Sequence, residues 1–119
     1  MSDVVSWVVE AAIKPGELDN FKTLADELVQ ATRANEPKTL GYEYFLSEDN
    51  GSCHIYERYA DSAAAMVHLK TFGERFAQRF LAATDITRLT VYGSANEEVR
   101  NVLGGFGASF MSQLNGFAR

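Results

Sequence analysis

A hairpin signal near the middle of the chain constrains the fold more than any other feature. Residues 40–47 and 52–59 are both rich in aromatic and β-branched side chains, and Glu48-Asp49-Asn50-Gly51 lies between them. Asn-Gly between two such runs favours a tight turn, because both residue types tolerate the positive φ angles that the turn requires. The sequence therefore predicts two antiparallel strands that are neighbours in one sheet.

Strands and amphipathic helices are predicted on both sides of this hairpin. Residues 4–13 carry apolar side chains on both alternating faces, which is typical of a strand covered on two sides. Apolar residues at helical spacing predict a helix over about residues 15–34. They predict a second helix from Ser62, with Asp61 as its N-cap and Gly73 as a candidate break.

A fourth strand over residues 86–92 completes the order β-α-β-β-α-β. This order is the ferredoxin-like plan, in which helices cover one face of an antiparallel sheet. A chain of 119 residues has room for one hydrophobic core. We therefore predict an α+β, ferredoxin-like domain over residues 1–94, with residues 95–119 as a C-terminal extension of the same domain.

The extension and the second face of the sheet indicate an oligomer. Residues 97–103 favour a short helix that ends at a Gly-Gly pair, and residues 108–113 favour a fifth strand. The predicted strands carry apolar residues on both faces, although the ferredoxin-like plan covers only one. We therefore expect a homodimer in which two sheets face each other. The extension of each chain is then expected to reach across to the second copy, where Phe106 and Phe110 either pack in the interface or close the partner's pocket.

The charge balance excludes several classes of partner. The sequence has 11 basic and 16 acidic side chains, a formal net charge of −5. Such a chain offers no basic surface to phosphate backbones or anionic lipid, so we expect neither nucleic-acid binding nor membrane association. The longest uncharged stretch, residues 101–118, holds four glycines and several polar side chains and is too polar to span a membrane. With no secretory signal and Cys53 as the sole cysteine, we expect a cytoplasmic protein without disulfides.

The residues that could carry chemistry lie between Glu57 and His68. The sequence contains no nucleophile elbow, phosphate-binding loop, dinucleotide fingerprint or metal-ligand spacing. Glu57 and Tyr59 share one face of the third strand, because side chains alternate there. His68 lies at the edge of the apolar stripe of the second helix, from which an imidazole can reach a pocket between helix and sheet. These three residues form the candidate site, and no metal is expected in it.

A structural interpretation of the same residues is the simpler one. A single His at a helix margin is more often a hydrogen-bonded structural residue, and Glu57 is more often a solvated or paired carboxylate. Cys53 lies in a strand beside no obvious base and is expected to be a packing residue. His54 lies on the opposite face of that strand, where we place it in the dimer interface.

Residues 55–69, which read Ile-Tyr-Glu-Arg-Tyr-Ala-Asp-Ser-Ala-Ala-Ala-Met-Val-His-Leu, resemble the antibiotic biosynthesis monooxygenase family. The shared features are a Glu-x-aromatic strand end, an Asp/Ser helix start followed by small residues, and a His nine residues after the aromatic. The similarity extends over roughly residues 4–93 through Lys14-Pro15-Gly16, Phe21, Gly41-Tyr42 and Phe72. The resemblance implies a dimeric α+β barrel, which agrees with the order of strands and helices derived above.

The resemblance also implies a cofactor-independent oxygenase that acts on a phenol, a hydroquinone or a related aromatic polyketide with molecular oxygen. A deprotonated, electron-rich phenol passes an electron to O₂ without metal or flavin, so no cofactor is expected. In this scheme His68 accepts the proton or stabilises the anion, and Glu57 orients His68. The substrate pocket is then lined by Trp7, Tyr42, Tyr59 and Phe72.

Two departures from the family pattern bear on function. The family usually has Trp at the position of Tyr59, and its haem-degrading branch has an Asn on the first strand, where residues 4–13 contain none. Haem degradation is therefore disfavoured. Two other functions fit the same fold. One is a non-catalytic dimeric module that binds an apolar small molecule, and the other is an isomerase or cyclase that uses the same acid–base groups without oxygen.

Overall fold

The computed structural model describes residues 2–119, and within them the helices and strands follow the predicted order with one additional short helix. The elements are β1 (Val5–Ile13), α1 (Leu18–Asn35), β2 (Thr39–Leu46), β3 (Ser52–Tyr59), α2 (Ser62–Arg75), α3 (Ala77–Ala83), β4 (Thr84–Gly93), α4 (Glu97–Gly104) and β5 (Ser109–Met111). The α+β, ferredoxin-like order and the additional helix and strand of the extension are therefore confirmed.

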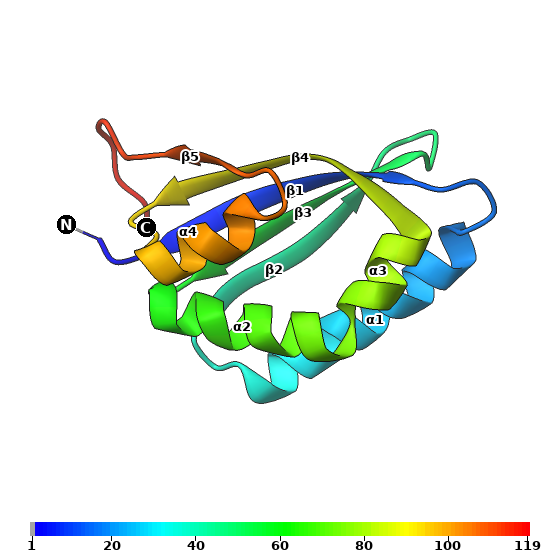
Figure 1. The fold of residues 1–119 in the computed structure, drawn as a ribbon, viewed down its shortest axis with the longest axis horizontal. Helices are drawn as coiled ribbons and strands as arrows, with labels where there is room; N and C mark the ends of the chain where they lie inside the picture. The colour runs from blue at the N-terminus through cyan, green and yellow to red at the C-terminus, as the bar shows by residue number, and fades with distance from the viewer. Residues whose placement is uncertain (1) are drawn as a thin grey trace.

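The strands form one five-stranded sheet in the order β2-β3-β1-β4-β5 (Figure 1). β1 lies at the centre, antiparallel to β3 and to β4, and Trp7 on β1 lies opposite Glu57 on β3. The expected antiparallel sheet is confirmed for β1 to β4. The strand of the extension, β5, for which no direction was predicted, pairs in parallel with β4, with Val91 opposite Phe110. The reason is that α4 carries the chain back along the sheet, and β5 therefore runs in the same direction as β4.

The predicted hairpin between β2 and β3 is confirmed. Asn50 has a φ of 61°, the positive value that the turn requires. The Asp49 carboxylate accepts a hydrogen bond from the backbone N–H of Gly51 at 2.9 Å, which holds the turn closed. The resulting register places Tyr42 opposite Glu57 on the face that the helices cover.

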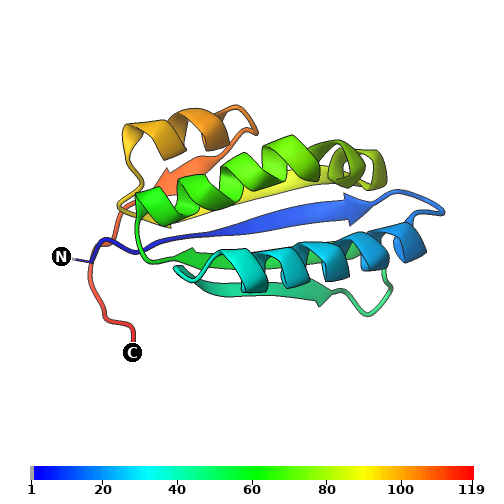
Figure 2. The same cartoon turned by 90° about the horizontal axis from the view of Figure 1, so that it is seen from below.

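The four helices of the described chain, α1 to α4, lie on one face of the sheet (Figure 2). α1 packs through residues that recur at intervals of three and four, which are Phe21, Leu24, Leu28 and Thr32. It begins at Leu18 rather than near residue 15, because Pro15 and Gly16 form a turn in which Gly16 has a φ of 80°. The core therefore lies between one helical layer and the sheet.

The second long helix begins where the sequence predicted. The Asp61 carboxylate accepts a hydrogen bond from the backbone N–H of Ala64 at 2.8 Å and so caps α2. The break in this helical region lies at Phe76, which is buried and separates α2 from α3 with a φ of −126°. Gly73, the candidate break, lies inside α2, and the space that a Cβ would occupy there is open.

The extension packs on its own chain as far as β5. Asn96 caps α4 by accepting a hydrogen bond from the backbone N–H of Val99 at 3.0 Å. Val99 and Leu103 are buried, and α4 contacts α2. This differs from the expected crossing to a second copy, because α4 and β5 complete the helical layer and the sheet of the same chain. Beyond β5, Leu114 and Phe117 are exposed.

The face of the sheet opposite the helices carries large exposed side chains. Phe45 on β2 and Tyr92 on β4 are 54% and 42% exposed there.

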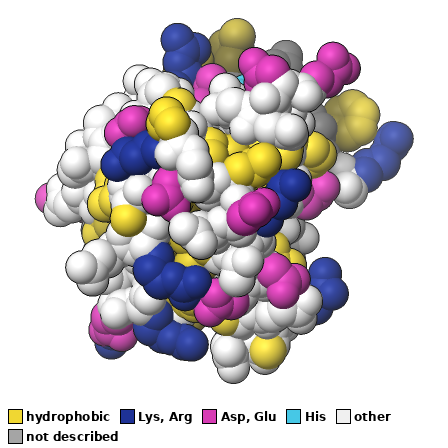
Figure 3. All heavy atoms as spheres, turned by 90° about the vertical axis from the view of Figure 1, so that its right-hand side faces the viewer, with side chains coloured by type: hydrophobic (Ala, Val, Ile, Leu, Met, Phe, Trp, Pro, Cys, Tyr) yellow, Lys and Arg dark blue, Asp and Glu magenta, His cyan; other side chains and the backbone are white. Residues whose placement is uncertain are grey.

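Acidic and basic side chains are interspersed at the end of the molecule that Figure 3 presents. Among residues 2–119 there is no helix with both the length and the apolar character needed to cross a membrane.

Candidate active site

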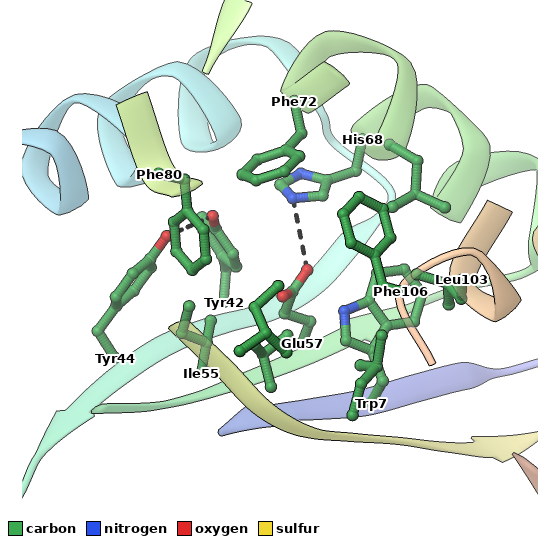
Figure 4. A pocket seen from close by; sticks show the side chains of 14 residues that line it. Trp7, Tyr42, Tyr44, Ile55, Glu57, His68, Phe72, Phe80, Leu103 and Phe106 are labelled. Carbon is green, nitrogen blue, oxygen red and sulfur yellow. Dashed lines mark hydrogen bonds and ion pairs between the residues drawn. The ribbon is translucent and has the colours of Figure 1, made fainter. Parts of the chain in front are cut away.

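A cavity of about 50 Å³ lies between the helices and the sheet (Figure 4). Its walls are mostly apolar, and their aromatic members are Trp7, Tyr42, Tyr44, Phe72, Phe80 and Phe106. Glu57 and His68 supply a carboxylate and an imidazole to the same cavity. An apolar chamber with a few convergent polar groups is the usual form of a small-molecule site.

His68 projects from α2 and forms a bridge between two carboxylates. Its side chain is only 4% exposed. Nδ1 lies 2.9 Å from Oε1 of Glu36, and Nε2 lies 3.4 Å from Oε1 of Glu57 (Figure 4). The structure therefore brings the predicted pair, His68 and Glu57, together beside the cavity and adds a second carboxylate behind the ring.

Glu36 was not among the residues predicted from the sequence. It caps the C-terminus of α1 and is buried, and its Oε1 also accepts a hydrogen bond from the Thr39 hydroxyl at 3.1 Å. A signal for it exists in the sequence, because Leu28, Thr32 and Glu36 continue the buried stripe of α1 at intervals of four. A carboxylate at the end of such a stripe indicates a buried acid that requires a partner.

Glu57 is held by neighbouring side chains. The Tyr59 hydroxyl donates to Oε1 of Glu57 at 2.7 Å, and Trp7 lies opposite Glu57 on the neighbouring strand. Burial raises the pKa of Glu57, although the His68 charge, the hydrogen bond from Tyr59 and the polar Trp7 side chain lower it in part. Glu57 is therefore a stronger base than an exposed carboxylate.

The two carboxylates determine the charge of His68. Burial by itself lowers the pKa of an imidazole, because it disfavours the cation. The hydrogen bond to Glu36 and the attraction of Glu57 outweigh burial, so the pKa of His68 is raised above its ordinary value. The site thus favours the protonated form of His68 more than solvent does.

The predicted pocket aromatics occupy different positions. Tyr42 and Phe72 line the cavity, and their ring centroids lie 4.9 Å and 6.5 Å from that of His68. Trp7 also lines it. Tyr59 lies outside the lining: its side chain is fully buried and stacks on Trp7 with the centroids 4.7 Å apart. Tyr59 therefore positions Glu57 instead of facing the space where a ligand would lie.

The extension contributes one wall of the cavity. Leu103 at the end of α4 and Phe106 in the following turn both line it. We expected Phe106 in a dimer interface or over the partner's pocket, whereas it lines the pocket of its own chain. A glycine-flanked aromatic after a short helix carries no signal for this position, because the position depends on how α4 packs on α2.

The remaining candidates lie away from the cavity. His54 is on the opposite face of the sheet, with Nε2 3.6 Å from Oε1 of Glu10. Cys53 is buried, and burial raises the pKa of its thiol to about 11, which is unfavourable for a nucleophile. Within residues 2–119, no group of three or more His, Cys, Asp or Glu side chains is arranged to hold a metal ion.

Solved structures share this fold at low sequence identity. MupZ from Pseudomonas fluorescens is 21% identical with a TM-score of 0.83, over 99% of this chain and 96% of MupZ. SnoaB from Streptomyces nogalater, a cofactor-independent oxygenase, is 16% identical with a TM-score of 0.66, over 80% of this chain and 96% of SnoaB. PA3566 from Pseudomonas aeruginosa is 22% identical with a TM-score of 0.62, over 76% and 91% of the two chains.

The sequence itself matches a known family profile. No curated protein gives a significant match to the chain. The profile described as antibiotic biosynthesis monooxygenase matches residues 5–78, which is more than half of the 119 residues. This stretch contains His68 and the two buried carboxylates that it bridges, Glu36 and Glu57. We call these three residues the buried relay. The chain belongs to the antibiotic biosynthesis monooxygenase family.

Proposed function

We propose that this protein is a monooxygenase that works without a cofactor and oxidises a phenolic, hydroquinone or polyketide-like aromatic small molecule. The observation that carries the proposal is the buried pair of Glu57 and His68 at the wall of an otherwise apolar and aromatic cavity. Membership of the family supports oxygenase chemistry. The shared fold of SnoaB, a cofactor-independent oxygenase, is consistent with it.

Proton removal from the substrate is the first task of the site. Glu57 accepts the proton, because a general base is most effective when its pKa is raised towards the working pH. His68, held as a cation by Glu36, stabilises the phenolate or enolate that forms. Tyr42, Phe72 and Trp7 provide the apolar surface against which an aromatic ring packs.

The substrate anion then supplies the electrons for oxygen activation. It transfers one electron to O₂, and the resulting radical pair combines to give a carbon–oxygen bond in a hydroperoxide. Loss of water breaks the O–O bond, so that one oxygen atom remains in the product as a carbonyl and the other leaves as water. For a ring CH₂ the balance is R₂CH₂ + O₂ → R₂C=O + H₂O, and no external reductant is consumed. The apolar walls limit access of water to the intermediates.

Oxygen consumption with a panel of hydroquinones and anthrone-type phenols tests this function. The two histidines of the chain offer a matched pair, because His68 is buried at the cavity and His54 is half exposed on the other face of the sheet. We expect His68→Ala to lose roughly 10²- to 10⁴-fold in kcat and His54→Ala to retain the wild-type rate. A folded His68→Ala protein with undiminished turnover contradicts the proposed role.

A second function is favoured by the relay of Glu36, His68 and Glu57. These groups can deliver and remove protons on a bound substrate without any oxygen, as an isomerase or a cyclase requires. Turnover of the same panel under argon distinguishes the two reactions. Products that form anaerobically at the aerobic rate favour the isomerase or cyclase, whereas strict dependence on O₂ favours the monooxygenase.

We also propose that the protein is a homodimer that associates through the face of the sheet without helices. Phe45 and Tyr92 are exposed on that face, and a second copy would bury them. Light scattering is then expected to give twice the 13.2 kDa of one chain. Phe45→Glu should shift the population towards monomer. A wild-type monomer at high concentration contradicts this assembly.

A further inference from the structure

The cavity beside Glu57 and His68 is smaller than the proposed substrates. Its volume is about 50 Å³, whereas a protein cavity that binds benzene measures about 150 Å³. Even a single aromatic ring therefore requires one wall to move. The wall that moves is expected to be the one whose side chain has the fewest restraining contacts.

Most aromatic side chains of the wall are fixed by a neighbouring ring. Trp7 stacks on Tyr59, and Tyr42 packs edge-on against Tyr44. Phe72 and Phe80 likewise form an edge-on pair. Phe106 belongs to no aromatic pair within residues 2–119.

Phe106 is also the most exposed of the aromatic lining residues. It is 39% exposed, whereas Trp7 is 1% exposed. Its ring nevertheless points into the cavity, towards the end where His68 and Glu57 meet (Figure 4). This side chain therefore lies between the site and solvent.

The backbone around Phe106 allows it to move. Gly104 and Gly107 have open space where a Cβ would lie, and Gly107 has a φ of 80°. The backbone N–H of Phe106 donates to the carbonyl of Leu103 at 3.0 Å, so the turn is anchored to α4. The hinge is thus a glycine-rich turn on a fixed helix, which permits a ring to swing without unfolding the helix.

We propose that Phe106 is the gate of the cavity and the residue that sets the size of its ligand. Withdrawal of the Phe106 ring frees the volume of about one benzene ring, which together with the existing 50 Å³ admits an aromatic ring beside Glu57 and His68. The aromatic class of ligand rests on the proposed function. Phe106 lies beyond residues 5–78, so this gate is an addition of the C-terminal extension to the family core.

The sole tryptophan of the chain provides a direct readout of the gate. Trp7 lines the cavity, so acrylamide can quench its fluorescence only by entering there or through local unfolding. Phe106→Ala is expected to raise the quenching constant of Trp7. Phe117→Ala is the matched control, because Phe117 is 80% exposed in the tail, and it is expected to leave the constant unchanged. Equal quenching in both variants, with equal unfolding free energies, overturns the gate.

Ligand size is tested with phenol, 1-naphthol and anthrone under argon, through the quenching of Trp7 on binding. The measured quantity is the ratio of the affinity for anthrone to the affinity for phenol. Phe106→Ala is expected to raise this ratio about tenfold above that of wild type, and Phe117→Ala is expected to leave it unchanged. An unchanged ratio overturns the gate while leaving the substrate class intact. Failure of all three compounds to bind either protein overturns the phenolic substrate class and, with it, the size selection by Phe106. Because no turnover is needed, neither outcome depends on oxygen chemistry.

Discussion

Oε1 of Glu36 lies 2.9 Å from Nδ1 of His68, on a ring nitrogen that Glu57 does not contact. Nδ1–H donates to this carboxylate, and this hydrogen bond fixes the orientation of the ring and leaves Nε2 for Glu57 and the cavity. The Thr39 hydroxyl fixes Glu36 in turn. Glu36 therefore controls how strongly the imidazole holds its proton, although it is not part of the cavity wall.

Glu36→Gln is expected to lower the pKa of His68. The wild-type pKa is raised because the hydrogen bond and the charge of Glu36 act with the charge of Glu57 against the effect of burial. Glutamine keeps a hydrogen-bond acceptor but removes the charge. Titration of the imidazole carbon-bound protons by NMR measures the change, and the exposed His54 serves as an internal reference. An unchanged His68 pKa contradicts the role assigned to Glu36.

Tyr59→Phe is expected to destabilise the fold by about 1.5–3 kcal/mol, because it leaves the buried Glu57 carboxylate with one donor fewer. The ring and its stacking on Trp7 remain, so the loss reports the hydroxyl alone. Urea denaturation measures the free energy of unfolding. Tyr92→Phe is the control, because Tyr92 is 42% exposed in a single chain, and at a protein concentration where light scattering gives a monomer it should cost less than about 0.5 kcal/mol. Equal stabilities of the two variants contradict a positioning role for Tyr59.

The architecture could be predicted because each of its determinants is local. Asn50 specifies the turn, Asp61 the start of α2, and the stripe that includes Phe21 the buried face of α1. The meeting of Glu57 and His68 followed from strand alternation and from the position of His68 at the helix margin. These are properties of single elements that the sequence displays directly.

The rest of the site depends on how separate elements pack. Glu36 meets His68 across 32 positions of sequence, and its position at the end of α1 is informative only once the packing of α1 and α2 is known. Phe106 enters the cavity because α4 packs against α2. Strand alternation places Tyr59 on the same face as Glu57. The Tyr59 ring stacks on Trp7, however, and does not line the cavity. Long-range packing of this kind has no short-range sequence pattern.

The stability of the protein is expected to fall as the pH rises above neutrality, and Glu36→Gln is expected to weaken this dependence. The folded pKa of His68 lies above its unfolded value of 6.5, so its contribution is complete below pH 6.5 and is lost as the pH rises through the folded pKa. Glu57 acts with the same sign, because its pKa is also raised above 4.5. Glu36 raises both pKa values, so its neutral replacement reduces both contributions. Urea denaturation of wild type, Glu36→Gln and His54→Gln between pH 5 and pH 9 measures the slopes; parallel curves for all three proteins contradict the buried relay as the source of the pH dependence.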